Sequence, residues 1–288
     1  MDKKLKAHIE DLLCIKISNI QSISGGDISH AFLLESDTER FFCKVNRNKE
    51  AYAMFLAEKQ GLEAISRTKT IAAPTVLLCE ALKKGGFLLL EYIEPKHPLF
   101  KDMELLGHQL AALHQYSDSK TFGWITDNFI GSLAQQNTMT TDWSTFYVRE
   151  RLMPQLQRAL DSKKLDFNEL PSEEKLLEIC QQFFPKEIEP ALLHGDLWSA
   201  NYLIATDGTP FLIDPATYYG HYEVDLSMTR LFGGFDASFY EAYGEHVTKV
   251  GNEKERTHLY QLYYLLVYLN LFGNSYKTSV RSILNTYF

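Results

Sequence analysis

The periodicity of the sequence changes near Pro95, and this change limits the chain to folds in which sheet and helix are segregated. Before Pro95, apolar or alternating runs are separated by turn signals such as Lys83-Lys84-Gly85-Gly86, a pattern typical of antiparallel hairpins. Residues 40–46 alternate strictly, with Phe41, Cys43 and Val45 on one face. The predicted strands are residues 15–24, 31–36, 40–46, 76–82 and 87–93.

Helical spacing predicts one helix before this point, over residues 49–66, and several after it. The later predicted helices are residues 103–114, 146–160, 173–183, 239–246 and 255–272, with a few short strands near residues 192–214. We therefore expect an α+β, two-lobed fold. Residues 1–94 would form a five-stranded antiparallel lobe with one helix, and residues 95–288 a mainly helical lobe.

The composition of the chain limits the kinds of binding partner and the cellular compartment that we expect. The net charge of −8 argues against a nucleic-acid partner, although a local cationic pocket for an anionic substrate is compatible with it. Four cysteines in 288 residues, none in a C-x-x-C pair, predict neither a disulfide framework nor a zinc site. The longest apolar run, residues 259–272, is too short and too polar to span a bilayer. We expect a cytoplasmic protein without a membrane partner.

The strongest functional signal is the segment His-Gly-Asp-Leu-Trp-Ser-Ala-Asn at residues 194–201, followed by an apolar strand that ends at Asp214. Phosphoryl transfer needs a carboxylate that positions the attacking hydroxyl, here Asp196. It also needs an amide and a second carboxylate that hold magnesium, here Asn201 and Asp214. A surface turn with capping aspartates is the alternative, and the complete pattern disfavours it.

This pattern resembles the protein-kinase-like fold, and Gly195, where protein kinases usually carry arginine, points to its small-molecule branch. Within that branch the chain resembles the fructosamine (ketosamine) kinase family from about residue 15 to residue 272. The similarity is carried by residues 25–29, 42–46, 122–143, 194–201 and 225–229. The resemblance implies that ATP and Mg²⁺ are used, with Asp196 as the base.

The resemblance makes Lys44 the residue that holds the α- and β-phosphates of ATP. Glu58 lies on the apolar stripe of the predicted helix, and a buried carboxylate costs several kcal/mol unless it is paired. Lys44 is the basic residue that this fold would bring to it. A solvated Lys44, a rotated helix face, and Glu63 as a rival partner off the stripe remain alternatives.

Other residues are predicted to surround the nucleotide. Gly25 and Gly26 would cover the phosphates with bare backbone N–H groups, although a plain hairpin turn explains them equally well. Ser29 could donate a hydrogen bond to a phosphate. By resemblance, adenine pairs with the backbone where the lobes join, at Glu91, Tyr92 and Ile93.

Two residues are expected to support the catalytic loop. The resemblance offers Asp225 as a buried carboxylate that accepts backbone N–H bonds, and a helix beginning near Leu226 makes Asp225 equally a candidate N-cap. By the same resemblance, His194 is a loop anchor and not a base. The remaining histidines, His108, His114 and His246 among them, show no ligand pairing in the sequence and are expected to be structural or solvated.

The substrate is predicted to be small. Trp198 stands where many protein kinases carry a lysine, and an aromatic ring there suits a sugar or a carbon chain, with ordinary packing as the alternative. Only eight residues separate Asp214 from Glu223, too few for a long segment that would dock a peptide. In the segment from residue 124 to 143, four polar residues could hydrogen-bond a polyol, or could simply pack a loop: Asp127, Asn128, Gln136 and Asn137.

We therefore expect a kinase that transfers the γ-phosphate of ATP to a hydroxyl of a ketosamine, either free or on a glycated protein. The resemblance implies the hydroxyl on carbon 3, whose phosphorylation makes the adduct labile and promotes deglycation. An aminoglycoside- or choline-type kinase is the nearest alternative. A catalytically inactive nucleotide-binding module is disfavoured because the whole polar set is present. The sequence does not indicate an oligomeric state.

Overall fold

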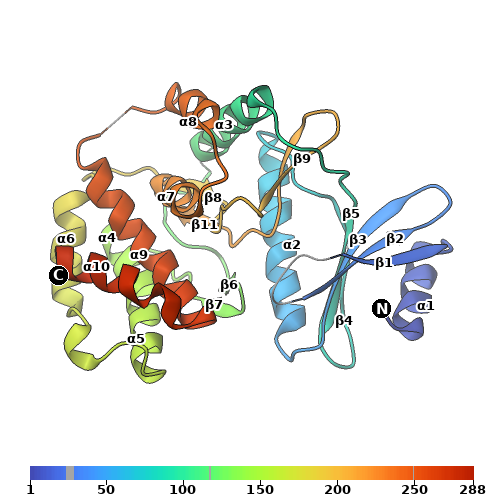
Figure 1. Ribbon diagram of the computed structural model, residues 1–288, viewed down its shortest axis with the longest axis horizontal. Coiled ribbons are helices and arrows are strands. Elements are labelled where there is room, and N and C mark those ends of the chain that lie inside the picture. The colour runs from blue at the N-terminus through green and yellow to red at the C-terminus, as the bar shows by residue number, and fades with distance from the viewer. Residues whose placement is uncertain (24–28, 117, 249) are drawn as a thin grey trace.

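Five strands from the first third of the chain form one antiparallel sheet in the order β1-β2-β3-β5-β4 (Figure 1). They are β1 (Asn19–Ile23), β2 (His30–Glu35), β3 (Arg40–Asn46), β4 (Val76–Ala81) and β5 (Gly86–Glu91). This computed structural model describes residues 1–23, 29–116, 118–248 and 250–288. The sheet precedes a helical part, so the predicted α+β class is confirmed.

The hairpins close at the predicted turns. Between β2 and β3, the Ser36 N–H donates to the Glu39 carbonyl at 2.9 Å, and the Ser36 hydroxyl accepts from the Glu39 N–H at 2.9 Å. Between β4 and β5, the Leu82 N–H donates to the Gly85 carbonyl at 2.9 Å. Gly85 has a φ of +78°, and a Cβ there would lie 1.9 Å from the Asn46 carbonyl oxygen, so this turn requires glycine.

The strict alternation in β3 gives the sheet two different faces. Cys43 and Val45 are buried in an apolar cluster with α1 (Lys3–Leu13). Lys44 points to the opposite face, which α2 (Ala51–Thr68) covers. Figure 1 shows the two helices on opposite sides of the sheet, with α2 between the sheet and the helical part.

The expectation of a single helix before residue 95 is wrong, because α1 is a second one. Asp2 caps it by accepting a hydrogen bond from the Leu5 N–H at 2.8 Å. Of its eleven residues, Leu5 and Ile9 are the buried ones. The spacing of Leu5, Ile9, Leu12 and Leu13 is helical, so this helix could have been predicted from the sequence.

The part after residue 95 is mainly helical, as predicted. Its α-helices are α3 (Phe100–Gln115), α4 (Trp143–Phe146), α5 (Met153–Asp161), α6 (Glu173–Phe183), α7 (Glu223–Phe232), α8 (Ala237–Gly244), α9 (Glu253–Phe272) and α10 (Lys277–Tyr287). Its short strands pair as β6 (Asn128–Ile130) with β7 (Leu133–Gln135), β8 (Ala191–Leu193) with β11 (Tyr218–Gly220), and β9 (Tyr202–Ile204) with β10 (Pro210–Leu212).

Three details of the helical part differ from the sequence-based expectation. The predicted helix over residues 146–160 contains a π-helical turn, Tyr147–Leu152. This turn comes just before Pro154 of α5, and proline has no backbone N–H to donate to the regular helical pattern. Helix α7 begins at Glu223, three residues earlier than expected. Helix α10 was not predicted, although Val280, Ile283, Leu284 and Tyr287 have helical spacing.

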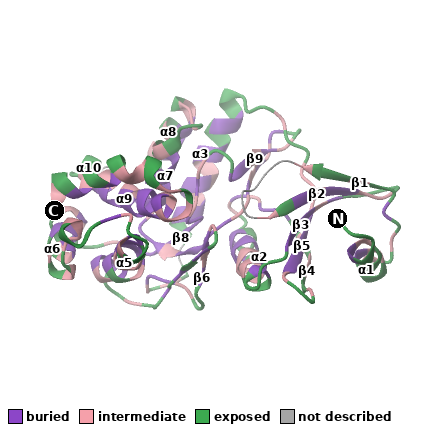
Figure 2. Cartoon of the chain, turned by 60° about the horizontal axis from the view of Figure 1, so that its bottom comes forward, coloured by how far each residue is buried: buried purple, intermediate pink, exposed green. Residues whose placement is uncertain are grey.

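Helix α9 forms the centre of the helical part. Its residues Tyr260, Tyr263 and Tyr264 are at most 1% exposed and belong to the core. Figure 2 shows buried residues running along α9 and β8 and along the inner strands of the sheet. Among the described residues, no helix is both long and apolar enough to cross a membrane.

One apolar cluster joins the sheet side of the molecule to the helical side. It contains Leu62 and Ile65 of α2 together with Leu106 and Leu110 of α3. It also contains Leu212 of β10, whose backbone N–H donates to the Ala72 carbonyl at 2.9 Å. Because this cluster is continuous across the proposed boundary, the division into lobes of residues 1–94 and 95–288 stays a prediction. The same cluster packs α2 against the segments that carry the polar motif.

Candidate active site

A cavity of about 660 Å³ lies between the sheet with α2 and the loops after β8 and β10. Most of the residues singled out from the sequence line it: Ser29, Lys44, Glu58, Glu91, Tyr92, Ile93, Asp196, Trp198, Asn201 and Asp214. Residues from three distant parts of the chain therefore meet at one hollow, as a shared site requires.

Lys44 stands between two carboxylates. Its Nζ lies 2.7 Å from Oε1 of Glu58 and also contacts Oδ1 of Asp214. Burial alone would lower the pKa of Lys44, but the charges of Asp214 and Glu58 outweigh it and raise that pKa. Burial raises the pKa of Glu58, and the Lys44 ammonium opposes this shift. The arrangement holds a charged ammonium at a fixed point of the cavity.

Helix α2 approaches the segment after Asp214 unusually closely. A Cβ at Gly61 would lie 2.8 Å from Oγ1 of Thr217 and 2.9 Å from Cγ of Pro215. Because Gly61 has no side chain, the helix can lie against this segment and place Glu58, one turn earlier, beside Asp214 and Lys44.

Asp196 and Asn201 are joined within one loop. The Asn201 side-chain N–H donates to the Asp196 carbonyl at 2.8 Å, and its Nδ2 lies 3.4 Å from Oδ2 of Asp196. The other carboxylate oxygen, Oδ1, is buried with no hydrogen-bond partner among the described residues. Burial, followed by the charges of Asp214 and Asp225, raises the pKa of Asp196 to about 7. A carboxylate so placed is suited to accept a proton near neutral pH.

The loop that carries Asp196 is fixed from behind by Asp225. The Asp225 carboxylate is fully buried and accepts from the backbone N–H groups of His194 at 2.7 Å and Gly195 at 2.9 Å. Gly195 has a φ of +83°, and a Cβ there would lie 2.2 Å from the Ala216 carbonyl oxygen. Because α7 begins at Glu223, Asp225 lies inside its first turn and is not the N-cap.

His194 serves the same loop in its neutral form. Its Nδ1 accepts from the Asp196 N–H at 3.2 Å, and its Nε2 donates to the Ile213 carbonyl at 2.8 Å. Burial lowers the pKa of His194, with Asp225 acting in the opposite direction. With one ring nitrogen accepting and the other donating, the imidazole links the two halves of the polar motif and lines no part of the cavity.

His114 of α3, expected to be either structural or solvated, is a supporting residue whose partners the sequence did not indicate. Its Nε2 lies 3.1 Å from Oδ2 of Asp225, and its Nδ1 lies 2.8 Å from the Tyr243 hydroxyl of α8. Its position was informative, because His114 lies four residues after Leu110 and therefore on the apolar stripe of the helix. A buried imidazole on such a stripe needs a partner, just as Glu58 does.

Asp214 adopts a backbone conformation that most residues avoid. Its φ is +55°, in the left-handed region, where aspartate and asparagine are tolerated better than other non-glycine residues. Its side chain is 39% exposed and faces the cavity while it contacts Lys44. A strained position that points a carboxylate into a cavity is typical of a functional residue.

The four predicted substrate residues of the 124–143 segment, Asn137 included, do not line the cavity. Asn128 is buried and donates to the Thr217 carbonyl at 2.8 Å, and Asp127 accepts from the Asn137 N–H at 2.9 Å. Gln136 is exposed, and its backbone carbonyl accepts from Arg151 at 2.5 Å. These groups hold the β6–β7 hairpin in place, and the hairpin residues that reach the cavity are Phe129, Ile130 and Gly131.

Gly25 and Gly26 lie outside the described residues. Ser29, the described residue that follows, lines the cavity, and its hydroxyl accepts from the Asn46 side chain at 3.4 Å. At the other end of the cavity, the Glu91 carboxylate accepts from the Thr75 N–H at 2.8 Å, which fixes the end of β5.

Solved structures share this fold. A candidate fructosamine-3-kinase from Thermobifida fusca YX-ER1 has a TM-score of 0.87 at 29% identity, covering 99% of this chain and 98% of that one. A spectinomycin phosphotransferase solved with ADP and spectinomycin has a TM-score of 0.62 at 15% identity, covering 99% and 94%, and bears on the fold alone. The fold and the polar cavity define a phosphotransferase of the kinase-like class.

Sequence comparison gives the family. The profile of the family described as fructosamine kinase matches residues 1–288. A Synechocystis sp. protein named as a probable ketoamine kinase is 39% identical over 271 residues, 93% of this chain and 90% of its own length. The chloroplastic protein-ribulosamine 3-kinase of Oryza sativa subsp. indica is 39% identical over 279 residues, 94% of this chain and 79% of its own. The chain belongs to the fructosamine kinase family, and it is a sugar kinase that phosphorylates a hydroxyl group, as the resemblance implied.

Proposed function

We propose that this protein transfers the γ-phosphate of ATP to the carbon-3 hydroxyl of a ketosamine, with Asp196 accepting the hydroxyl proton. The observation that carries the proposal is the meeting of Asp196 and Lys44 at one cavity, the first with a raised pKa and a buried, unpartnered oxygen. As the hydroxyl oxygen forms its bond to phosphorus, its proton passes to Asp196 and ADP leaves. Catalysis of this kind is mostly positioning and charge stabilisation.

Asn201 and Asp214 fit a magnesium ion. The Asn201 Nδ2 is engaged with Asp196, which leaves the amide oxygen to face a cation, and the Asp214 carboxylate opens to the cavity. Such hard oxygen ligands suit Mg²⁺, which takes its remaining ligands from water and phosphate. When bound, the ion would supply neutralisation of the phosphate charge. Lys44, already held by Glu58, would contact the α- and β-phosphates from the other side.

We propose that residues 1–94 form the nucleotide-binding lobe and residues 95–288 the catalytic and acceptor lobe. Adenine would pair with the backbone at residues 91–93, where β5 ends at the cavity. Gly25 and Gly26 would cover the phosphates, and Ser29, beside the cavity, would donate to one of them.

The acceptor side of the cavity supports a small, partly apolar substrate. Trp198, Phe129, Ile130 and Tyr268 line it, and aromatic faces suit the C–H faces of a sugar chain. The short segment after Asp214 contains β11, which pairs with β8, so little chain remains there to dock a peptide. Whether the ketosamine is free or attached to a protein, its phosphorylation at carbon 3 would release the amine. Four free cysteines, all among the described residues, support a reducing cytoplasm.

A panel assay tests the proposal. The protein is incubated with ATP and Mg²⁺ and, separately, with ribulosamines, fructosamines, aminoglycosides and choline, and ADP release is measured for each. Ketosamine-dependent ADP release, with a phosphate found on carbon 3 by NMR, is the expected result. Release with aminoglycosides or choline alone would contradict the proposed acceptor, and ATP binding without release on any acceptor would contradict catalysis.

A further inference from the structure

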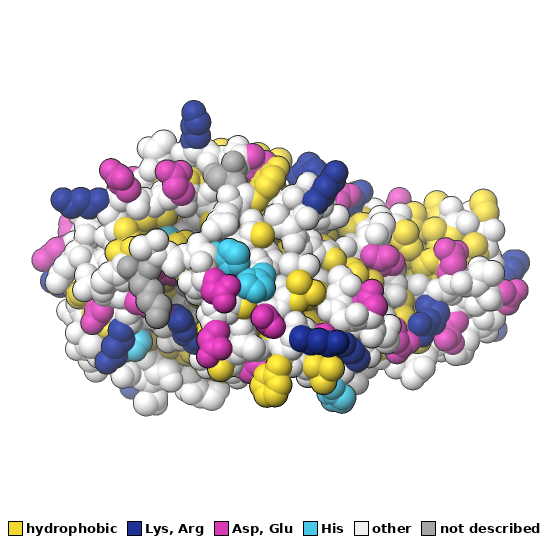
Figure 3. Space-filling view, turned by 90° about the horizontal axis from the view of Figure 1, so that it is seen from above, with side chains coloured by type: hydrophobic (Ala, Val, Ile, Leu, Met, Phe, Trp, Pro, Cys, Tyr) yellow, Lys and Arg dark blue, Asp and Glu magenta, His cyan; other side chains and the backbone are white. Residues whose placement is uncertain are grey.

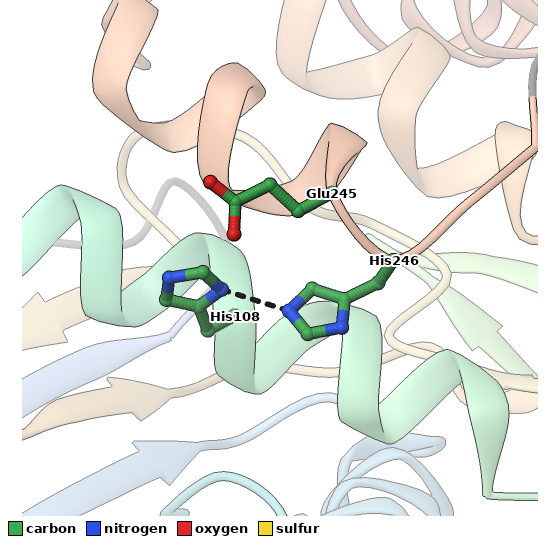
Figure 4. A group of neighbouring side chains, drawn as sticks. All are labelled: His108, Glu245 and His246. Carbon is green, nitrogen blue, oxygen red and sulfur yellow. Dashed lines mark hydrogen bonds between the residues drawn. The ribbon is translucent and has the colours of Figure 1, made fainter.

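Two histidines and a glutamate meet on the surface where α3 packs against α8 and the turn that follows it. His108 of α3 and Glu245 and His246, which follow α8, each offer one ligand atom, and these atoms all lie within 4.8 Å of one another. The His108 Nδ1 lies 2.8 Å from the His246 Nε2. Figure 4 shows the two rings facing each other with the Glu245 carboxylate turned toward His108. Figure 3 shows histidine and acidic side chains gathered on this face.

The scaffold under this cluster is rigid. Helices α3 and α8 pack so closely that a Cβ at Gly107 would lie 2.4 Å from the Phe239 carbonyl oxygen. The Gln115 side chain donates to the His246 carbonyl at 2.8 Å, which ties the residues after α8 back to α3. Side chains presented by two tightly packed helices lose little freedom when they bind an ion, so the cluster is pre-organised.

The three side-chain atoms of this cluster determine which kind of metal ion it can bind. Two imidazole nitrogens and one carboxylate suit a first-row transition metal, whereas Mg²⁺ and Ca²⁺ prefer oxygen ligands alone. Zn–N bonds of about 2.0–2.1 Å in a tetrahedron place two ligand nitrogens about 3.3 Å apart, so the present 2.8 Å gap needs to open by about 0.5 Å. A small rotation of exposed or half-buried rings achieves this. The hydrogen bond requires a proton on one of the facing nitrogens. Metal binding at that nitrogen requires the other tautomer of the ring, in which the proton sits on the nitrogen that faces away.

We propose that His108, Glu245 and His246 form a binding site for a divalent transition metal, with Zn²⁺ the best fit, separate from the magnesium site of catalysis. Three protein ligands leave the fourth tetrahedral position to water. Glu104 and Glu241, one helical turn before His108 and Glu245, add negative charge nearby that attracts a cation.

The metal would clamp the end of α8 to α3. These are the helices whose Tyr243 and His114 stand behind Asp225, so the clamp would stabilise the support of the catalytic loop without touching substrate. The expected consequence is a metal-dependent gain in thermal stability, because a ligand that binds only the folded state shifts the unfolding equilibrium.

The test uses the full chain after treatment with a chelator. Zn²⁺ binding is measured by competition with a chromophoric chelator, Co²⁺ binding by its visible absorption, and stability by thermal melting with and without Zn²⁺. His108→Gln and His246→Gln are made singly and together, with His97→Gln, an exposed histidine in the loop before α3, as the matched control. Asp214→Asn reports any Zn²⁺ held at the catalytic site.

We expect one Zn²⁺ per chain, a Co²⁺ spectrum of tetrahedral intensity, and a higher melting temperature with Zn²⁺. Loss of a hydrogen bond that only supports a metal ligand typically weakens metal binding by ~10–100-fold, so loss of a ligand itself in each single variant should weaken Zn²⁺ binding by at least this factor. His97→Gln and Asp214→Asn should bind Zn²⁺ normally. Binding that survives in the double histidine variant, or that is lost in Asp214→Asn, would overturn the proposal. So would the absence of saturable binding by the natural chain.

Discussion

The ammonium of Lys44 in β3 lies 2.7 Å from the carboxylate of Glu58 in α2, and together they link the sheet to the helix that covers it. Both side chains are largely buried, and the Asp214 carboxylate is the third member of the group. An ammonium between two carboxylates is held in place before any phosphate arrives. Glu58 is therefore a positioning residue for Lys44, and removing its charge should affect nucleotide use more than folding.

We predict that Glu58→Gln lowers kcat/KM for ATP by about 10–100-fold, the value of one hydrogen bond to a charged group. Asp214 still pairs with Lys44 in this variant, so the melting temperature should change little. Glu63→Gln is the control, because Glu63 is exposed one turn further along α2 and pairs with Lys59. Equal kinetics in the two variants would show that Glu58 has no such role.

The Lys44–Glu58 pair also shows what the sequence could predict. Burying an unpaired carboxylate on the apolar stripe of a helix costs free energy. The position of Glu58 in the sequence therefore predicted that it has a basic partner. The strands of the sheet and the long helices were predictable for a related reason, since their apolar residues repeat with a clear period. The polar motif was predictable because its residues lie on one short loop and at the end of the next strand.

Other features depend on contacts that no local pattern encodes. Asn128 was predicted to contact a polyol, but its amide donates to the Thr217 carbonyl, a partner distant in the sequence, and its side chain does not line the cavity. His108 lies on α3 and His246 in the turn after α8, and only the packing of these segments brings the rings together. Tertiary contacts decide both features, so the sequence alone could not predict them.

We predict that Asp196→Asn lowers kcat by about 10²–10⁴-fold, the usual effect of a positioned base, and leaves MgATP affinity near normal. Because the pKa of Asp196 is raised to about 7 in the free protein, kcat/KM of the natural chain should fall as the pH drops below about 7. The residual kcat/KM of Asp196→Asn should not show this fall at acidic pH. Near-normal turnover in steady-state assays would remove Asp196 as the base.

The buried carboxyl of Asp196 should also lower the free energy of unfolding at high pH. A carboxyl whose pKa rises from 3.8 in the unfolded chain to about 7 in the fold binds more protons when folded. Its contribution to stability is therefore full below pH 3.8 and is lost as the pH rises through about 7. Asp196→Asn, which carries no charge, should be more stable than the natural chain at pH 8 by up to about 4 kcal/mol.

Denaturant titration without metal or nucleotide measures this difference, and the two free energies of unfolding should converge as the pH falls from 7 toward 4. A difference that grows toward acidic pH would contradict the raised pKa, since it would mean that the folded state favours the ionised carboxyl.

We predict that Asp214→Asn weakens magnesium-dependent ATP binding by at least about tenfold, comparable with the loss of a metal-orienting group. Asparagine is the appropriate substitution because it tolerates the φ of +55°, whereas alanine would add backbone strain. Calorimetry with and without Mg²⁺ measures the effect, and Asp207→Asn, in the exposed β9–β10 turn, is the control. Unchanged affinity and unchanged magnesium dependence would exclude Asp214 as a ligand.

The last prediction concerns Trp198, which both lines the cavity and packs against the core of the helical part. If its ring contacts the acceptor equally in ground and transition states, Trp198→Ala should raise the KM for a ketosamine and leave kcat and the KM for ATP similar. If packing is its main role, the variant should instead lose stability, approaching the ~3–5 kcal/mol typical of a fully buried tryptophan.

Steady-state kinetics and thermal melting on the same variant separate the two roles. We expect a selective rise in the KM for the ketosamine with a modest fall in melting temperature, because Trp198 is half-buried and lines the cavity. Trp198→Phe, which keeps an aromatic face, should restore most of the affinity for the acceptor. A large fall in melting temperature with both KM values unchanged would assign Trp198 to the core and leave Phe129 and Tyr268 as the aromatic residues of the acceptor side.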